Sequence, residues 1–156
     1  IPGVSDILFI GTGVFHPLGV QLATGAHVVA LDPFSGHAVE VDAGKFLRKR
    51  HALIEKARDA AHIGIIISTK QGQNRYDLGI RLLSLSDKAF LVFMKEVSPD
   101  ELLNLGFDAY VNTACPRLAY DDQVRFPVPV LTPAEYEILC GTRTWEDYTI
   151  DEMLCQ

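Results

Sequence analysis

The segment His62–Ser68 places the strongest constraint on the fold. It carries isoleucine at positions 63, 65, 66 and 67. β-branched side chains favour strands, and consecutive residues of a strand point to opposite faces of the sheet. A strand that is apolar on both faces must be covered on both sides, as in the middle of a parallel sheet. The sequence therefore predicts a central, buried strand here.

Strands and helices alternate after this segment. Two further apolar runs, Lys88–Met94 and Phe107–Val111, favour strands. A helix is expected after each strand, and Ser98, followed by proline and two acids, is a typical helix start. The short run Val128–Leu131 precedes a capping box that begins at Thr132. The pattern predicts an α/β domain with a parallel sheet and flanking helices.

The first part of the chain has the pattern of a smaller β-α-β end piece. Ile7–Ile10 and His27–Leu31 are apolar runs typical of strands, with a helical pattern between them and a candidate edge strand at Val39–Asp42. The amphipathic, basic stretch from Ala43 to Ala61 is the natural domain boundary. The expected division is an end piece over residues 1–42, a connecting helix over 43–59 and a whole α/β domain over 60–156.

Glycines precede the helix of this end piece. Gly11, Gly13 and Gly19 surround His16 and Pro17 between the first strand and the helix. Glycine lets a backbone approach a ligand, and a helix N-terminus offers free N–H groups, so an anion or carboxylate could bind here. The spacing does not match the dinucleotide-binding fingerprint. A tight turn and a ligand cradle both stay open.

Composition argues against several classes of protein. The 156 residues are 48% hydrophobic and 22% charged, which indicates a packed core rather than disorder. The apolar runs are far shorter than the roughly 20 residues that a membrane helix needs, so no membrane span is expected. A net charge of -6 argues against a general affinity for nucleic acid. The three cysteines lack disulfide-scaffold or zinc spacing, so a reducing, cytoplasmic setting is expected.

Cys115 is the residue best placed for chemistry. It follows the apolar run Ala109–Val111 within the stretch Asn112–Arg117, ahead of Asp121 and its acidic neighbour. Open α/β folds gather ligand-binding residues where their strands end, and a thiol at such an edge can meet a ligand. The alternative is a small buried hydrophobic residue, the commoner role of a free cysteine.

A second polar segment is expected at the same edge of the sheet. The central strand ends in the loop Ser68–Arg75, which contains Lys70 and Gln73. Lys70 and Arg75 would suit a carboxylate or a phosphate. A solvated loop whose serine or threonine caps the next helix is the alternative.

The other two cysteines are expected to have no ligand role. Cys140 sits in a helix beside Ile138 and Leu139, a position typical of core packing. Cys155 is next to the chain end, where solvent exposure or disorder is expected.

Several motifs occur together and in a fixed order. They are Gly11–Gly19, Leu31–Phe34, Ser68–Gln73, Asn112–Arg117 with Asp121-Asp122, Leu131–Glu137 and Trp145–Tyr148. With these motifs in this order, essentially all of the chain resembles the later part of the archaeal diphthamide-synthesis enzymes, the 2-(3-amino-3-carboxypropyl)histidine synthases.

The resemblance implies a fold of similar α/β domains in which each of three domains gives one cysteine to a [4Fe-4S] cluster. Residues 1–42 would end the second domain, and residues 60–156 would form the third, with Cys115 as its cluster ligand. S-adenosylmethionine would be the substrate, and breaking the bond from its sulfur to the γ-carbon would release a 3-amino-3-carboxypropyl radical. The acceptor would be a histidine of elongation factor 2, and the archaeal members are expected to be homodimers.

The resemblance also suggests roles for further residues by motif position. Gly13 and His16 would form part of the wall of the substrate pocket. Lys70, Gln73 and Arg75 would supply polar groups near the cofactor or the target loop. Arg117 and Asp121 would support the cysteine segment.

Two other classes of function stay open. The chain could be a partner module that ligates nothing and helps another subunit to hold its cluster, as in the family's heterodimeric relatives. It could instead be a nucleotide-binding α/β enzyme that uses the Gly11–Gly19 turn, which equilibrium dialysis with common nucleotides would test. The chain begins at Ile1 rather than methionine, and we take it for a product of truncation or processing.

The 156-residue polypeptide alone is expected to lack a normally ligated cluster and to be inactive, because neither Cys140 nor Cys155 lies in a motif that could replace the two cysteines of the other domains. Ultraviolet-visible and EPR spectra after anaerobic reconstitution check this. A stoichiometric [4Fe-4S] signal that depends on Cys115 would contradict it.

Overall fold

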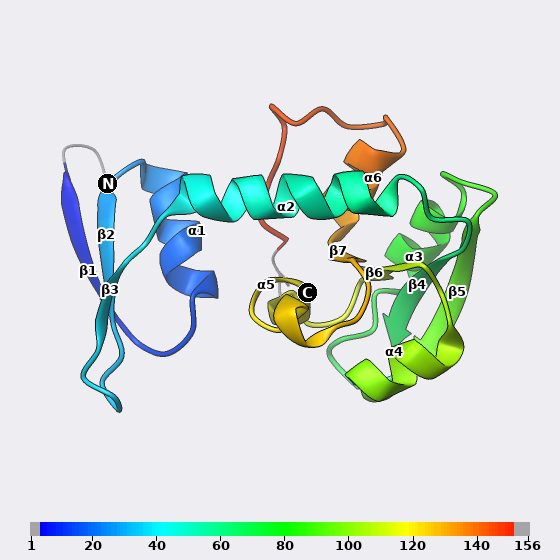
Figure 1. The fold of residues 1–156 in the computed structure, drawn as a ribbon, viewed down its shortest axis with the longest axis horizontal. Helices are drawn as coiled ribbons and strands as arrows, with labels where there is room; N and C mark the ends of the chain where they lie inside the picture. Colours follow the sequence, from blue (N-terminus) through cyan, green and yellow to red (C-terminus); the bar gives the residue numbers. More distant parts are fainter. Residues whose placement is uncertain (1–3, 152–156) are drawn as a thin grey trace. The chain divides into compact units, whose positions relative to one another are not determined.

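Residues 4–151 form two compact units in the structure, a computed structural model that describes this range of the chain. The division between the two units falls between Arg50 and His51. The division falls inside helix α2 (Ala43–Ala57), which Figure 1 shows as one continuous helix. The amphipathic helix predicted in this region is confirmed, while the proposed division at residues 42 and 59 stays a prediction.

The first unit is a β-α-β piece with an added edge strand. β1 (Asp6–Ile10) and β2 (His27–Leu31) pair in parallel, and α1 (Phe15–Thr24) connects them. β3 (Ala38–Glu40) pairs with β2 in the antiparallel direction. His16 lies in the first turn of α1, where a following proline is tolerated because that turn needs no intrahelical N–H partner.

The second unit contains a parallel sheet. Over the described part of this unit the strand order is β5 (Ala89–Met94), β4 (Ile63–Ser68), β6 (Ala109–Asn112) and β7 (Val130–Leu131), and every neighbouring pair is parallel. β4 is buried along its whole length. The predicted fold class and the central position of the isoleucine-rich strand are confirmed.

Helices connect these strands. They are α3 (Tyr76–Leu83), α4 (Pro99–Leu105), α5 (Arg117–Tyr120), a 3-10 turn (Gln123–Arg125) and α6 (Pro133–Leu139). Ser98 accepts the Glu101 N–H at the start of α4, and Thr132 begins the predicted capping box of α6. No sequence pattern predicted α5 or the 3-10 turn, and neither has a side-chain cap. Across residues 4–151 no helix combines the length and apolar character that crossing a membrane requires.

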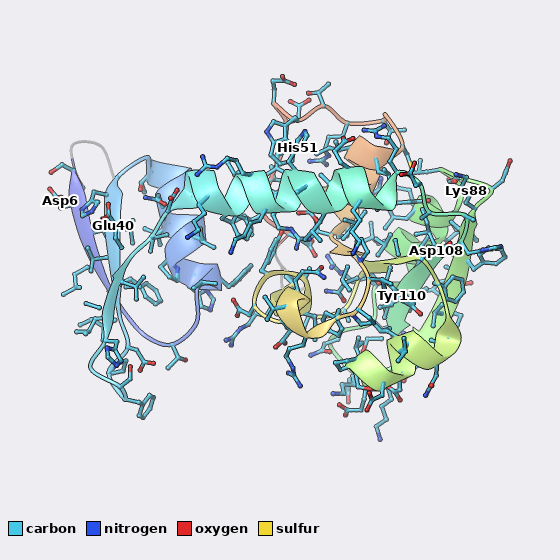
Figure 2. The ribbon with its side chains drawn as sticks, in the orientation of Figure 1. Asp6, Glu40, His51, Lys88, Asp108 and Tyr110 are labelled. Atoms are coloured by element: carbon cyan, nitrogen blue, oxygen red, sulfur yellow. The ribbon has the colours of Figure 1, made fainter. Side chains whose placement is uncertain are left out.

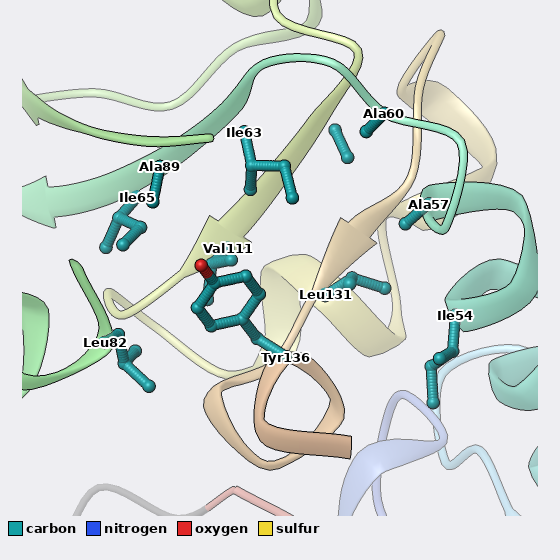
Figure 3. Close-up of a cluster of buried hydrophobic side chains, with 11 residues drawn as sticks. Ile54, Ala57, Ala60, Ile63, Ile65, Leu82, Ala89, Val111, Leu131 and Tyr136 are labelled. Atoms are coloured by element: carbon teal, nitrogen blue, oxygen red, sulfur yellow. The ribbon is translucent and has the colours of Figure 1, made fainter. Parts of the chain in front are cut away.

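The core of the second unit lies in two clusters of apolar side chains. Ile65 belongs to the first, together with Leu82 of α3 and Tyr136 of α6 (Figure 3). Its neighbour Ile66 belongs to the second, together with Leu102 of α4. Both isoleucines are 0% exposed. Consecutive residues of β4 therefore fill different clusters, as expected of a strand that is covered on both faces.

Gly64 of β4 lies against the ring of Tyr110. A Cβ at this position would lie 2.8 Å from both Cδ1 and Cε1 of that ring. The Tyr110 side chain, labelled in Figure 2, is fully buried, and its hydroxyl donates to the Leu102 carbonyl at 2.6 Å. The hydrogen bond and the packing leave the ring little freedom to move.

The variant Gly64→Ala is expected to lower the free energy of unfolding by about 1–3 kcal/mol, because overpacking forces neighbouring groups out of their minima. Urea denaturation checks this. The same substitution in a Tyr110→Leu background should cost less, since the smaller side chain leaves room for the methyl group. Equal losses in the two backgrounds would show that the ring is not the obstacle.

Candidate functional site

The cysteine loop, residues 113–116, joins β6 to α5 at the carboxyl edge of the parallel sheet. Thr113 is buried, and both its N–H and its hydroxyl donate to the Ile66 carbonyl, at 3.2 and 2.6 Å. Cys115 is a free cysteine and is partly exposed. The beginning of the loop is therefore fastened to the central strand, while the thiol lies at the accessible edge.

Asn112, the last residue of β6, closes the cysteine loop with its side chain. Its Nδ2 donates to the Cys115 carbonyl at 2.8 Å, and its Oδ1 accepts the Ala114 N–H at 3.0 Å. Asn112 is 1% exposed, so water has little access to these bonds. The signal for this role is an asparagine at a strand end, because asparagine often bonds the backbone that follows it. We did not select Asn112 as a site residue from the sequence.

Arg117 and Asp121 lie one turn apart, directly after the cysteine loop. The Arg117 Nε donates to Asp121 Oδ2 at 2.9 Å. This hydrogen bond and the charge of Asp121 raise the pKa of the Arg117 guanidinium, and Cys115 acts in the same direction. Asp121 Oδ1 is buried without a hydrogen-bond partner in the described part of the chain. Both residues lie where the predicted supporting role requires, and that role stays a prediction.

Arg75 precedes α3 and reaches the cysteine loop. Its Nε donates to the Thr113 carbonyl at 2.7 Å, and its Nη1 and Nη2 donate to the two carboxylate oxygens of Asp151 at 2.9 and 2.6 Å. From the sequence we placed Arg75 near a cofactor or target loop. In the structure its described hydrogen bonds go to the loop backbone and to Asp151, a residue that no local pattern singled out.

Lys70 and Gln73 lie in the loop that follows β4. Lys70 Nζ pairs with the exposed carboxylate of Glu96 at 2.9 Å. The Gln73 N–H donates to the Lys70 carbonyl at 3.1 Å, which forms a turn. Of the three polar residues predicted here, Arg75 is the one that hydrogen-bonds to the cysteine loop among the described contacts.

Gly13 and His16 belong to the first unit. Gly13 has a φ of 79°, a conformation that favours glycine, and is exposed. The exposed ring of His16 stacks on Phe9 with centroids 6.4 Å apart and meets Phe15 edge-on at 5.1 Å. The turn expected around Gly13 is present, and the predicted role of both residues in a pocket wall stays a prediction.

The described cysteines have different surroundings. Cys140 packs against the first core cluster, and burial raises the pKa of its thiol. A protonated thiol is a poor metal ligand, and core packing of Cys140 is confirmed. Cys155 lies outside the described residues.

Cys115 has the properties that a cluster ligand needs. Iron–sulfur clusters are held mainly by cysteine thiolates. This thiol is free, partly exposed and carried on a hydrogen-bonded loop. Within residues 4–151 no group of three or more His, Cys, Asp or Glu side chains could hold a metal ion. The described chain therefore offers one fitting ligand rather than a complete set.

Comparisons with known proteins agree on one family. The family described as "Putative diphthamide synthesis protein" matches residues 2–150. The 2-(3-amino-3-carboxypropyl)histidine synthase of Pyrococcus horikoshii is 45% identical over 152 residues, which cover 95% of this chain and 44% of that protein. The synthase of Methanocaldococcus jannaschii is 35% identical over 141 residues, or 85% of this chain and 41% of that protein.

A solved structure gives the same result. The crystal structure of Dph2 from Pyrococcus horikoshii with a 4Fe-4S cluster matches with a TM-score of 0.80 and 43% identity, covering 96% of this chain and 44% of that one. The chain thus spans less than half the length of the relatives that it matches.

The variant Asn112→Asp is expected to destabilise the second unit by about 1–3 kcal/mol at neutral pH, because a carboxylate oxygen would face the Cys115 carbonyl without a proton to donate. Burial would raise the pKa of the new carboxyl above its unfolded value. Protonation at low pH restores the donor, so the deficit relative to the wild type should shrink as pH falls and grow as pH rises through that pKa. Urea denaturation of both proteins from pH 4 to 8 measures it, and a deficit independent of pH would contradict the assigned hydrogen bond.

Proposed function

Because the chain belongs to the family of diphthamide synthesis proteins, we propose that it is the C-terminal, cluster-binding part of a 2-(3-amino-3-carboxypropyl)histidine synthase. The complete enzyme would transfer the 3-amino-3-carboxypropyl group of S-adenosylmethionine to a histidine of elongation factor 2 by a radical route, the first step of diphthamide synthesis. The chain spans 44% of its Pyrococcus horikoshii relative, so this activity is proposed for the complete enzyme.

One observation carries the proposal. The free, partly exposed Cys115 ends a stretch of buried, hydrogen-bonded backbone at the carboxyl edge of a parallel sheet. Ligand sites of open α/β folds gather at this edge. The structure of a relative with a matching fold was solved with a 4Fe-4S cluster, which supports a role for the Cys115 thiol as a ligand of such a cluster.

Each residue around Cys115 has a part in the proposed site. Cys115 would give one thiolate to a [4Fe-4S] cluster, which when bound supplies the electron for breaking a carbon–sulfur bond of S-adenosylmethionine. Asn112 holds the Cys115 carbonyl, and Thr113 fastens the loop to β4. Arg117, braced by Asp121, places a positive charge within electrostatic range of the thiol.

Substrate contacts are proposed for the remaining candidates. Lys70 is a partly exposed cation that pairs with Glu96, which is itself largely exposed, so an incoming carboxylate could compete for it. We assign Lys70 and Gln73 to the cofactor or the target loop, and Gly13 and His16 to the wall of the substrate pocket.

Partners and setting follow from the same proposal. Elongation factor 2 would be the protein substrate, and the complete enzyme would be a cytoplasmic homodimer. We expect no direct contact with nucleic acid, because a net charge of -6 disfavours binding to phosphates.

A chimera tests the function. The chain replaces the matching segment of the Pyrococcus horikoshii synthase, to which it is 45% identical over 152 residues. After anaerobic reconstitution and reduction, the chimera should consume S-adenosylmethionine, add the 3-amino-3-carboxypropyl mass to elongation factor 2 and release methylthioadenosine, which is what remains when that group leaves. Cys115→Ala should lower both products by more than about 100-fold, because loss of a ligand should cost more than the roughly 10–100-fold that loss of an outer-shell partner costs.

Cys140→Ala is the matched control, since it removes a thiol of the same chain that packs in the core. It should leave the cluster spectrum and both products within about twofold of the unsubstituted chimera. A chimera that binds the cluster and forms methylthioadenosine without Cys115 would refute the assignment. A chimera that binds the cluster through Cys115 but never modifies elongation factor 2 would favour a partner module.

A further inference from the structure

The Arg75 side chain commits most of its hydrogen-bonding capacity to the protein. An arginine has five N–H donors. Arg75 makes hydrogen bonds to the Thr113 carbonyl at 2.7 Å, to the Ala114 carbonyl at 3.5 Å, and to both carboxylate oxygens of Asp151 at 2.9 and 2.6 Å. The two carbonyls belong to the residues immediately before Cys115. The guanidinium is therefore occupied by the cysteine loop and by Asp151.

Asp151 extends this contact to the other side of the cysteine. Its backbone N–H donates to the Tyr120 hydroxyl at 2.9 Å. Tyr120 lies in α5, which begins two residues after Cys115, and is 8% exposed. Arg75 thus holds the backbone before the cysteine, and Asp151 contacts the helix after it. Arg75 and Asp151, which are distant from the cysteine loop in sequence, therefore contact the chain on both sides of Cys115.

The surroundings make this ion pair stronger than one at the surface. The side chains of Arg75 and Asp151 are 20% and 11% exposed. Partial burial lowers the effective dielectric constant, and paired N–H donors match a carboxylate in geometry as well as charge. Lysine has no planar fork, so it could not bond the carboxylate and the Thr113 carbonyl in the same way.

We propose that Arg75 and Asp151 are a positioning pair, which holds the cysteine loop so that the Cys115 thiol is presented at the sheet edge. The inference rests on the proposed function of Cys115 as a ligand. Arg75 acts through the loop backbone, to which its Nε and Nη2 donate. Loss of either partner leaves the other charge partly buried and frees the loop to open.

Local opening of the loop can be measured in the 156-residue chain without any cluster. Hydrogen exchange reports on the Thr113, Leu118 and Ala119 amides, which donate to backbone carbonyls within or beside the loop. The rate of alkylation of Cys115, resolved from the other thiols by peptide mass spectrometry, reports on the thiol. Arg75→Gln and Asp151→Asn should each raise both rates about 10-fold, as expected when about 1.4 kcal/mol of local stability is lost. The amides of β4 should be unchanged.

Arg58→Gln is the matched control. It breaks an arginine–carboxylate pair with Glu55 that also has two hydrogen bonds, but both side chains are about half exposed, at 56% and 47%. It should alter neither rate at Cys115. Arg75→Lys keeps the charge and should give an intermediate effect. Unchanged loop exchange and alkylation in Arg75→Gln, or equal acceleration in Arg58→Gln, would overturn the proposal.

Spectroscopy of the reconstituted chimera measures the cluster itself, whose occupancy and EPR signal should not change when a residue that only stabilises the fold is substituted. Arg75→Gln should lower cluster occupancy and broaden the EPR signal at a temperature where the fold is intact, with Arg75→Lys partly restoring both. Faster alkylation with an unchanged cluster signal would overturn the link to ligand presentation. Failure of the proposed function has a different signature, a cluster signal in the unsubstituted chimera that persists in Cys115→Ala.

Discussion

Burial of β4 on both faces is the constraint on which the second unit depends. Strands on either side and two apolar clusters enclose it, so its length and register are fixed. The pairing of Ile66 with Asn112 sets where β6 ends relative to β4. The Ile66 carbonyl then receives two hydrogen bonds from Thr113, the first residue of the cysteine loop. The loop that carries the thiol is therefore fastened to a strand that is buried along its whole length, although the loop itself is short.

Two kinds of restraint act on the cysteine loop, and they differ in range. Asn112 works locally, because its amide bonds to backbone only two and three residues further along the chain. Arg75 and Asp151 work at long range, since 76 positions separate them and both must be in place. The local restraint fixes the shape of the turn. The long-range one makes the position of that turn depend on contacts with two segments that are distant in sequence, the loop before α3 and the segment that contains Asp151.

Features of the fold that were predictable from the sequence are those encoded by neighbouring residues. Three local patterns predict the elements in which they lie. They are the isoleucines of β4, the serine at the start of α4 and the capping box of α6. The position of Cys115 at a sheet edge followed from the apolar run before it. The role of Arg75 did not follow, because its charge indicates an anionic partner but not which one. That partner is Asp151 of the same chain, and no periodicity connects residues so far apart. Helix α5 was missed because its single turn is stabilised by surrounding contacts rather than by a cap.

The contrast between Cys115 and Cys140 shows why residue type alone does not locate a ligand. Burial against the first core cluster raises the pKa of Cys140, so releasing its proton would place a charge in an apolar setting. Cys115 lies where the backbone leaves the sheet and where Arg117 supplies a positive charge. A cluster shared among several loops imposes a further demand, since each loop must hold its thiol in place before the metal can. If Cys115 is a cluster ligand, as proposed, hydrogen bonds from Asn112, Thr113 and Arg75 would meet that demand in advance, and the entropy of ordering the loop would be lost on folding rather than on cluster binding.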